Sequence, residues 1–482
     1  MKLSEKFNLR KTQYELDFVD IDLTKDTPLF IDPYFLAQRN DQWSIDANRS
    51  IRSFFQHIIN LIRANSIDQG RELFVHLGEP NETCLGLSKG APQGRGVGSG
   101  DASKIFNSLL QSTAVRTGIV EDIEDCRVLV AGVDKDKISD MATNVIRKHL
   151  MEYTQKQCEL WEIPLQNNVP SGFFWDRHER EWKNNYSKML IVDEKKILLT
   201  PKGIVSFVKD YTAQQYKQHF VLNFLQNEHL RMNSVLVQRR ISRNGRERVF
   251  VTKKSISEYE EPMDKEYLAR FTQSHPEIFD KFKSEVKKNL SSVKNSEITE
   301  DSLSDIIDFL ISELRNTPTG TTNATKYHKL IVGILELIFY PNLTSPQVER
   351  QIDQGRKRID ITFDNAASSG FFHRLHSVNE IPSQFIFVEC KNYTGDVTNP
   401  ELDQLSGRFS LHSGKMGMLL CRKIEDFDTF IQRCRDTYIA GRGVVIPIVD
   451  SDLINILENI KNRNEETEEQ LLSDRFRDIA LS

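Results

Sequence analysis

The chain lacks any cysteine arrangement that would define a disulfide framework or a zinc site. Its 482 residues include only six cysteines, and no two of them form a Cys-x-x-Cys pair. We therefore expect free thiols in a reducing compartment, which places the protein in the cytoplasm. The six are Cys84, Cys126, Cys158, Cys390, Cys421 and Cys434.

Long apolar runs are also missing. The longest run, residues 331–340, is interrupted by Glu336 and is much shorter than the roughly 20 apolar residues that a membrane-spanning helix needs. The first eleven residues are polar and charged, so no secretory signal peptide is expected. The sequence predicts a soluble intracellular protein without membrane contact.

An excess of positive charge is absent as well. The chain has 64 Lys and Arg residues against 69 Asp and Glu, a formal net charge of −5 at pH 7. Any contact with nucleic acid must therefore come from local basic patches. No internal repeat is visible, and the length predicts about three domains, each large enough to bury a core.

Residues 78–100 are rich in glycine but lack the common phosphate-binding motifs. No Gly-Lys-Ser/Thr follows, and the glycine spacing differs from the dinucleotide-binding fingerprint. Backbone amides at the start of the following helix, predicted near Asp101, can bind an anion. Because Asp101 would repel phosphate there, a surface loop is the favoured interpretation, and Arg95 is the residue that tests the alternative.

The residues with the most informative chemistry occur in two apolar runs near the C-terminus. In residues 359–363 apolar side chains alternate, which places Asp360 on the opposite face of a predicted strand. In residues 387–391, Glu389 and Lys391 are two apart and therefore share a face. If the two strands pair, two carboxylates and one ammonium group converge.

Such a site suits hydrolysis of a phosphodiester assisted by a divalent metal. Mg²⁺ prefers oxygen ligands, and Asp360, Glu389 and the backbone carbonyl of Cys390 are the predicted ligands. The metal would lower the pKa of a bound water and neutralise charge on the phosphorane. Lys391 could orient or deprotonate that water, or stabilise the transition state, and the sequence leaves these roles open. A simple ion pair at a strand end is the alternative.

Basic residues precede the predicted site. Arg356, Lys357 and Arg358 lie just before Asp360, in a hairpin whose turn is predicted at residues 353–355. Their positive charge can reach a phosphate backbone close to the metal, so we expect them to bind nucleic acid.

A polar helix is predicted after the second strand. Asn399 is a favourable N-cap, and Pro400 suits the first helical position. Gln404 and Arg408 are four residues apart and share one face of this helix. Further core strands are predicted at residues 416–421 and 443–449, followed by a last helix.

This order of elements and motifs resembles the PD-(D/E)xK nuclease superfamily, in its restriction-endonuclease-like and Mrr-like branch. The resemblance covers residues 325–460 of the chain. It implies a mixed sheet flanked by helices, hydrolysis of nucleic-acid phosphodiesters, and Mg²⁺ as cofactor with Mn²⁺ as a substitute. The Asp, Glu and Lys of the family correspond to Asp360, Glu389 and Lys391, and the Gln of Mrr-like members corresponds to Gln404.

One feature of the family is not clearly matched. Many members carry a Glu on the helix before the Asp strand, where it supports a second metal. The helix predicted at residues 326–339 offers Glu336, but its apolar stripe leaves Glu336 on the opposite face, as expected for a solvated residue. His328 occupies the position where that Glu often falls, and a capping or packing role is expected for it. Whether one or two metals bind stays open.

A second basic segment lies in the middle of the chain, at residues 231–254. Asn244-Gly245 predicts a hairpin turn between two short strands. A basic ribbon can contact phosphates, and Arg239, Arg240 and Arg243 are the predicted contacts. A solvated charged hairpin is the equally weighted alternative.

The rest of the chain gives weaker predictions. We expect an N-terminal α/β or α+β region, with strands at 17–23, 27–34 and 72–77 and a helix at 48–67. The predicted domains are 1–230 for this region, 231–314 for the basic hairpin and a helical connector, 315–324 for a linker, 325–460 for the nuclease-like domain and 461–482 for a charged tail.

The sequence thus predicts a Mg²⁺-dependent DNA endonuclease whose N-terminal region senses or selects the target. Analogy with restriction enzymes gives defence against phage DNA as the setting. Two alternatives stay open: a nuclease that cuts RNA or branched DNA in repair, and a catalytically silent nucleic-acid-binding assembly module. Either a homo-oligomer or a partner protein from a defence system is compatible with the sequence.

Overall fold

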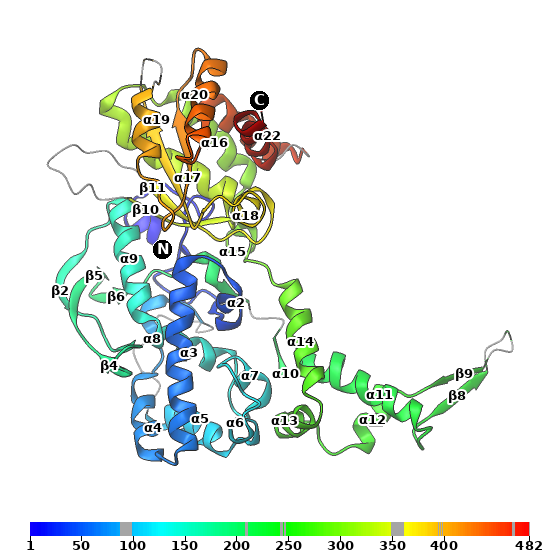
Figure 1. Ribbon diagram of the computed structural model, residues 1–482. Helices are drawn as coiled ribbons and strands as arrows, with labels where there is room; N and C mark the ends of the chain where they lie inside the picture. The colour runs from blue at the N-terminus through cyan, green and yellow to red at the C-terminus, as the bar shows by residue number, and fades with distance from the viewer. Residues whose placement is uncertain are drawn as a thin grey trace.

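The computed structural model describes residues 1–86, 99–207, 211–241, 244, 247–348, 361–393, 395, 397, 399–464 and 468–481. The predicted α/β class is confirmed. Helices form most of the N-terminal part, and a five-stranded mixed sheet interleaved with helices forms the C-terminal part (Figure 1).

The N-terminal body is built around the long helix α3 (Gln42–Arg63), as Figure 1 shows. Its buried residues recur every three or four positions, which gives the helix one apolar face. Asp41 caps the helix by accepting a hydrogen bond from the backbone amide of Ser44 at 2.9 Å, so the helix begins at Gln42 rather than at residue 48. The other helices of this body are α1 (Leu3–Lys6), α2 (Pro33–Gln38), α4 (Ile67–Leu73), α5 (Ser99–Gln111), α6 (Thr113–Thr117), α7 (Asp125–Leu129), α8 (Lys135–Val145) and α9 (Arg147–Trp161).

Small antiparallel sheets complete the N-terminal body. They join β1 (Phe30–Ile31) to β7 (Val205–Ser206), β2 (Gln166–Pro170) to β5 (Tyr186–Val192) and β6 (Lys195–Ile197), and β3 (Phe174–Asp176) to β4 (Glu181–Lys183). The predicted strand at 27–34 is shortened to β1, because Asp32 caps α2 by accepting a hydrogen bond from the backbone amide of Phe35.

Two strands predicted in this body are wrong. Residues 72–77 form the end of α4 and the 3-10 helix η1 (Phe74–His76), because the buried Phe74 and Leu77 are three residues apart, a spacing that suits a helix better than a strand. Residues 17–23 form no strand. Phe18 makes an isolated bridge to Pro201. Asp20 accepts a hydrogen bond from the backbone amide of Ser4 on α1, and Asp17 accepts one from the hydroxyl of Tyr153 on α9.

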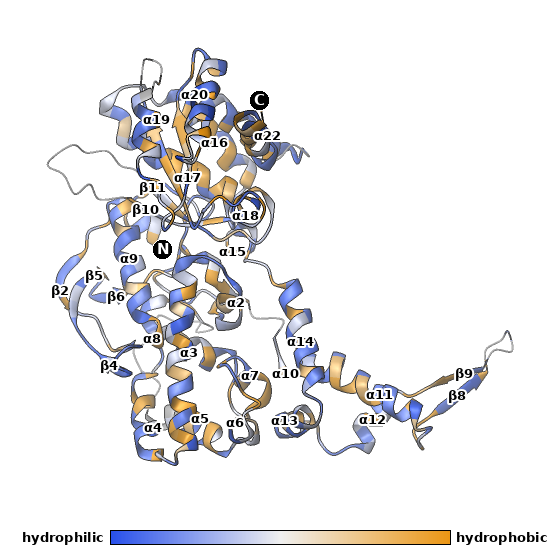
Figure 2. Cartoon of the chain, in the orientation of Figure 1, coloured by the Kyte–Doolittle hydropathy of each residue, from blue (hydrophilic) through white to orange (hydrophobic). Residues whose placement is uncertain are grey.

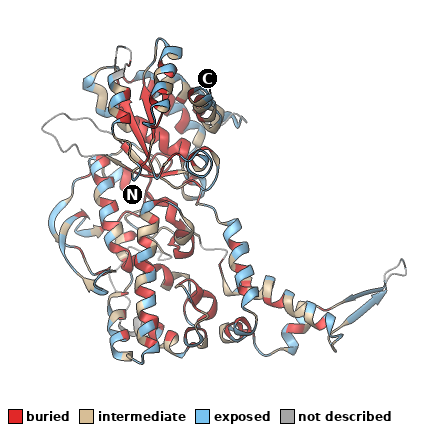
Figure 3. Cartoon of the chain, in the orientation of Figure 1, coloured by how far each residue is buried: buried red, intermediate tan, exposed pale blue. Residues whose placement is uncertain are grey.

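The segment that lies between the N-terminal and C-terminal parts in the chain forms an arm that projects away from the N-terminal body (Figure 1). The two antiparallel strands of the predicted hairpin are present at its tip, as β8 (Gln238–Ile241) and β9 (Glu247–Phe250). The first strand starts later in the chain than the predicted 235–238, and Gly245 of the predicted turn lies outside the described residues. Figure 3 shows this ribbon as exposed, in contrast to the buried strands of the C-terminal sheet. The helices of the arm and its base are α10 (Ala213–Gln215), the π-helix η4 (Tyr216–Val221), α11 (Leu222–Arg231), α12 (Lys253–Tyr259), α13 (Lys265–Ser274) and α14 (Pro276–Asn289).

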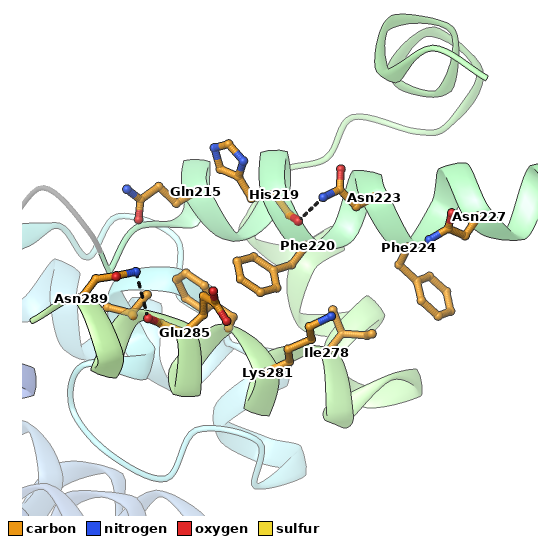
Figure 4. A pocket seen from close by; sticks show the side chains of 12 residues that line it. Gln215, His219, Phe220, Asn223, Phe224, Asn227, Ile278, Lys281, Glu285 and Asn289 are labelled. Carbon is orange, nitrogen blue, oxygen red and sulfur yellow. Dashed lines mark hydrogen bonds between the residues drawn. The ribbon is translucent and has the colours of Figure 1, made fainter. Parts of the chain in front are cut away.

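A groove of about 530 Å³ lies at the base of the arm, between η4–α11 and α14 (Figure 4). Phe220 and Phe224 point into it, and polar side chains such as Asn223 form its rim. Asn223 donates a hydrogen bond to the backbone carbonyl of His219 at 2.6 Å and so stays on its own helix. Glu389, Lys391 and Gln404, the described residues predicted to be catalytic, do not line this groove.

The C-terminal sheet has the order β10-β11-β12-β13-β14. The first three strands are antiparallel neighbours, whereas β12, β13 and β14 are parallel and are joined by crossover helices. The strands are β10 (Leu343–Val348), β11 (Ile361–Asn365), β12 (Phe385–Lys391), β13 (Met416–Cys421) and β14 (Val444–Val449). The helices are α15 (Asn295–Ile298), α16 (Leu303–Asn316), α17 (Ala324–Phe339), α18 (Gly370–Ser377), α19 (Asn399–Ser406), α20 (Phe427–Ile439), α21 (Asp450–Asn462) and α22 (Glu468–Leu481), with the 3-10 helix η5 (Thr321–Asn323) before α17.

The strands of the C-terminal sheet are buried because helices cover both of its faces. Every residue of β13 is buried, and its apolar sequence matches a parallel strand covered by helices on both faces, as the hydrophobic colour of the sheet in Figure 2 shows. The helix predicted at 326–339 is confirmed as α17. The turn predicted at 353–355 lies outside the described residues, while β10 and β11 on either side of it pair antiparallel.

The N-terminal body packs against the β10 edge of this sheet. The side-chain amide of Gln157 donates a hydrogen bond to the backbone carbonyl of Pro346 at 3.0 Å. Arg39 donates to the carbonyl of Gly203 at 2.9 Å and to the hydroxyl of Thr344 at 3.4 Å. One guanidinium therefore joins the body to β10.

Glu336 on α17 corrects a prediction. We expected it to be solvated, but its side chain is fully buried and its Oε2 atom lies 3.4 Å from Nζ of Lys202. Helix α17 therefore has two buried faces. The apolar stripe defines one of them, and the N-terminal body covers the other, which carries Glu336.

Candidate active site

Strand β12 presents Glu389 and Lys391 at the carboxyl end of the parallel part of the sheet. In the register with β13, Glu389 lies opposite Leu419 and Lys391 opposite Cys421. The two residues alternate with Val388 and Cys390, so both project from the same face. Glu389 is 1 % exposed and Lys391 is 4 % exposed, so their charges are almost completely withdrawn from water.

These two residues form the centre of a small polar cluster. Nζ of Lys391 forms an ion pair with Oε1 of Glu389 and lies 3.5 Å from Oε1 of Gln404. Nη1 of Arg408 lies 3.5 Å from the second carboxylate oxygen of Glu389. The structure thus brings together Glu389, Lys391, Gln404 and Arg408. Their catalytic and binding roles stay predictions. The predicted convergence of Asp360 with Glu389 and Lys391 also stays a prediction, because Asp360 lies outside the described residues.

Helix α19 places Gln404 beside the strand. Leu402 and Leu405, on its other face, are buried against the sheet. A Cβ atom at Gly417 of β13 would lie 3.0 Å from the side chain of Leu405, so the missing side chain allows the helix to approach closely. The helix ends at Ser406, and Arg408 follows in the next turn with its side chain 20 % exposed.

The backbone carbonyl of Cys390, predicted as a metal ligand, has a neighbour that the sequence did not predict. Nε2 of His328, on α17, lies 2.9 Å from this carbonyl oxygen. His328 is therefore neither a cap nor a simple packing residue. Its partner is a backbone atom, which residue types alone do not reveal.

A second polar cluster lies on the opposite side of β13 and β14, where each strand ends. The hydroxyl of Tyr327 donates to Asp450 at 2.8 Å, and Nε of Arg422 lies 3.0 Å from the other oxygen of Asp450. Burial raises the pKa of Asp450 to about 6. Sequence reasoning missed these three residues, although their positions directly after two core strands gave a signal that could have found them.

Several predicted site residues lie outside the described residues: Asp360, Arg356, Lys357, Arg358 and Arg243. Ile361, which follows Asp360 in the chain, is the partner of Val388 in the pairing of β11 with β12. Among the residues that the structure does describe, no three His, Cys, Asp or Glu side chains are grouped so that they could hold a metal ion.

The donor set around Glu389 nevertheless fits a hard divalent cation. It offers a carboxylate and a backbone carbonyl, both oxygen donors, and no thiolate points to the Glu389 face because the Cys390 side chain is on the other side of β12. Glu389 now contacts two cationic side chains, which neutralise its buried charge. A metal ion bound to Glu389 would compete with these contacts.

The predicted basic contacts of the hairpin are not part of this cluster. Arg239 and Arg240 lie on β8, at the tip of the arm and far from α19 in Figure 1. Arg239 lies 3.5 Å from Glu247 on the neighbouring strand. The hairpin and the polar cluster are therefore two separate features.

Comparison with known proteins identifies only part of the chain. Residues 8–213 match the model of a domain of unknown function, DUF8370. No curated protein and no solved structure gives a significant match. None of the described helices is long and apolar enough to cross a membrane.

Proposed function

We propose that the protein is a metal-dependent endonuclease that hydrolyses phosphodiester bonds in DNA, and that residues 325–460 form its catalytic domain of the PD-(D/E)xK type. The observation that carries this proposal is the buried pair of Glu389 and Lys391, with Gln404 and Arg408 around it. The five-stranded mixed sheet with helices on both faces supports it, because the pair lies at the carboxyl end of a parallel strand, where such sheets commonly bind ligands.

The free-energy cost of burying the charges of Glu389 and Lys391 favours a functional role for this pair. Removing two charges from water costs several kcal/mol per ion, and an apolar pair of similar volume is often as stable or more stable. An ion pair kept inside a sheet of apolar strands therefore has a reason other than stability. Such a reason would be binding of a metal ion by the carboxylate of Glu389 and of a phosphate by the ammonium group of Lys391.

The residues around the pair have distinct proposed roles. Glu389, the carbonyl of Cys390 and Asp360 would hold Mg²⁺ or Mn²⁺. Asp360 lies outside the described residues and directly precedes Ile361 in the chain, which is the partner of Val388 in the pairing of β11 with β12. The metal, when bound, would activate a water and offset the negative charge of the phosphate. Lys391 would orient that water or stabilise the developing charge, and Gln404 would position Lys391.

Arg408 is the residue of this cluster that would meet the substrate. Its side chain is partly exposed while its guanidinium reaches Glu389, so it lies between solvent and the buried pair. A guanidinium forms bidentate hydrogen bonds with phosphate, which makes Arg408 the proposed phosphate contact among the described residues of this site.

A cleavage panel tests the proposal. The purified chain is incubated with supercoiled plasmid, linear duplex, single-stranded DNA and RNA, each with Mg²⁺, with Mn²⁺ and with EDTA. We expect metal-dependent cutting of DNA that is lost in Asp360→Asn and Lys391→Met. Lys326→Met is the control, because Lys326 is exposed on α17 of the same domain and pairs with Glu313, 2.9 Å away.

The outcomes separate the alternatives. Cutting that survives both substitutions would contradict the assigned site. Metal-dependent cutting of RNA alone would favour the RNA nuclease, and binding without cutting under every condition would favour a silent binding module. Thermal unfolding of each variant shows that it is folded.

We also propose that the N-terminal region selects the target and that the setting is defence against foreign DNA. Its support is the direct packing of residues 8–213 on β10, which neighbours the strand that follows Asp360. Plaque counts on cells that carry the native chain or Lys391→Met test this setting, because only the native chain should reduce them.

A further inference from the structure

The β8–β9 ribbon has one face that is cationic and uncompensated. Arg240 lies directly opposite Arg248 in the strand register, so the two side chains project from the same face. Both are exposed, and neither forms an ion pair with any residue that the structure describes. The same face carries Gln238 opposite Phe250 and no acidic residue.

The other face of the ribbon is different. Arg239 lies 3.5 Å from Glu247, which balances its charge. Ile241 and Val249 share this face and are 73 % and 44 % exposed. The ribbon therefore presents a basic face and a mixed, partly apolar face.

Two other cations of the arm have partners within the protein. Arg231 pairs with Glu228 at 2.9 Å, and the Nζ atom of Lys253 donates to the backbone carbonyl of Gln218. The cross-strand pair on β8 and β9 instead places two positive charges side by side without a counter-charge among the described residues. Like charges directly opposite each other destabilise a hairpin, so this pair indicates an anionic partner.

The shape of the ribbon favours one class of anionic partner. Its two strands are about 4.8 Å apart, and the major groove of B-form DNA, about 12 Å wide, admits a two-stranded ribbon. The major groove of duplex RNA is too deep and narrow for this. Single-stranded nucleic acid is bound largely by stacking on aromatic side chains, and the described strands carry a single aromatic residue, Phe250, which is half-buried.

We propose that the β8–β9 ribbon is a docking element for duplex DNA, in which Arg240 and Arg248 contact phosphates at the edges of the major groove, away from the cleavage site. The choice of DNA rests on the proposed nuclease function, but docking itself requires no cleavage. The ribbon lies at the end of an arm, far from the strand that carries Glu389 (Figure 1), which supports a docking element separate from the cleavage site.

The test measures binding without cleavage. Fluorescence anisotropy follows a labelled 30-base-pair duplex in EDTA over a range of KCl concentrations, with the full chain and with R240Q/R248Q. Loss of two phosphate contacts should weaken binding about tenfold and reduce the slope of log K against log salt by about 2. R49Q/R52Q is the matched control, since it removes two positive charges from exposed residues of α3 and should leave both values unchanged.

Further variants and ligands make the result decisive. R240K/R248K should keep most of the salt dependence, which separates loss of charge from misfolding of the hairpin. Unchanged affinity in R240Q/R248Q, an equal loss in R49Q/R52Q, or equal loss of binding to duplex RNA would each overturn the proposal. A chain that cuts no DNA but still loses affinity and salt slope in R240Q/R248Q would contradict the nuclease proposal alone, so a failure of the nuclease proposal leaves a different signature from a failure of docking.

Discussion

Lys202 and Glu336 face each other inside the protein, with Nζ 3.4 Å from Oε2 and neither side chain exposed to solvent. Lys202 belongs to the segment that matches DUF8370, and Glu336 belongs to α17 of the C-terminal part. Asp17 lies in the same buried cluster, where it accepts a hydrogen bond from the hydroxyl of Tyr153 at 2.5 Å. Burial raises the pKa of Glu336 and lowers the pKa of Lys202. The two parts of the chain therefore share a buried ionic contact.

This contact gives a first prediction. Lys202→Met leaves Glu336 without its cation, and we expect the free energy of unfolding to fall by about 3–5 kcal/mol. K202M/E336L removes both charges and should recover most of that loss, which urea unfolding of the two single variants and the double variant measures. Lys6→Met removes an exposed partner of Asp193 and should change stability by less than about 1 kcal/mol. A double variant as unstable as Lys202→Met alone would contradict the coupling.

Asp364 on β11 gives a prediction of pH dependence. Burial raises its pKa to about 8, and Asp41 and Asp17 add to the effect while Lys156 opposes it. The folded state thus holds this proton more tightly than the unfolded state. The resulting stability is fully present below the unfolded pKa of about 4 and is lost as the pH rises through 8.

Asp364→Asn should flatten that profile. In the native chain the contribution of this group falls by up to about 1.4 kcal/mol per pH unit between pH 4 and 8. The variant should lack this slope and should gain relative stability at pH 8 to 9. Urea midpoints measured from pH 5 to 9 test this, with Asp68→Asn, a change at an exposed residue of α4, as the control. A steeper slope in Asp364→Asn would reverse the assigned direction.

Gln404 gives a prediction about activity. Its Oε1 atom lies 3.5 Å from Nζ of Lys391, so Gln404→Ala should lower the cleavage rate about 10- to 100-fold, as is usual for residues that orient a ligand or catalytic group. Lys391→Met should lower it further. Asp403→Ala on the same helix removes an exposed partner of Arg442 and should cleave normally. A rate for Gln404→Ala equal to that of Asp403→Ala would exclude a positioning role.

Gly414 gives a prediction about the start of β12. Its φ is +131°, and a Cβ atom would lie 2.6 Å from the backbone carbonyl oxygen of Phe385. Gly414→Ala should therefore lower the free energy of unfolding by at least about 2 kcal/mol. Gly441→Ala, with φ of +70° and no atom within 4 Å, separates backbone strain from steric overlap and should cost about 1 kcal/mol. Similar losses in the two variants would show that the close approach to Phe385 is not important.

The C-terminal elements were the most predictable from sequence. The apolar runs of β13 and β14 and the long amphipathic pattern of α17 each have one strong interpretation, and the structure contains all three. The positions of Glu389 and Lys391 on one face followed from strand alternation alone. Gln404 followed from its place on the predicted helix, whereas Arg408 lies beyond the end of α19 at Ser406, so the predicted helical spacing with Gln404 did not place it.

The errors have physical causes that one stretch of sequence does not show. The burial of Glu336 depends on Lys202, which is more than a hundred residues away in the chain. The contact of His328 is with a backbone carbonyl, which any residue at position 390 would provide. The six residues at 72–77 are too few for their apolar pattern to distinguish a strand from a helical turn. Long-range partners and backbone contacts were therefore the missing information.

Arg39 couples the N-terminal body to the C-terminal sheet. Its guanidinium holds the backbone of the N-terminal body with one nitrogen and Thr344 of β10 with another. Strand β10 is bonded to β11, and β11 is bonded to β12, which carries Glu389. Gly203 lies in the 3-10 helix η3 (Lys202–Ile204). A shift of this helix would therefore displace β10, two strands from the buried carboxylate, so a ligand bound to the N-terminal body could alter the geometry around Glu389.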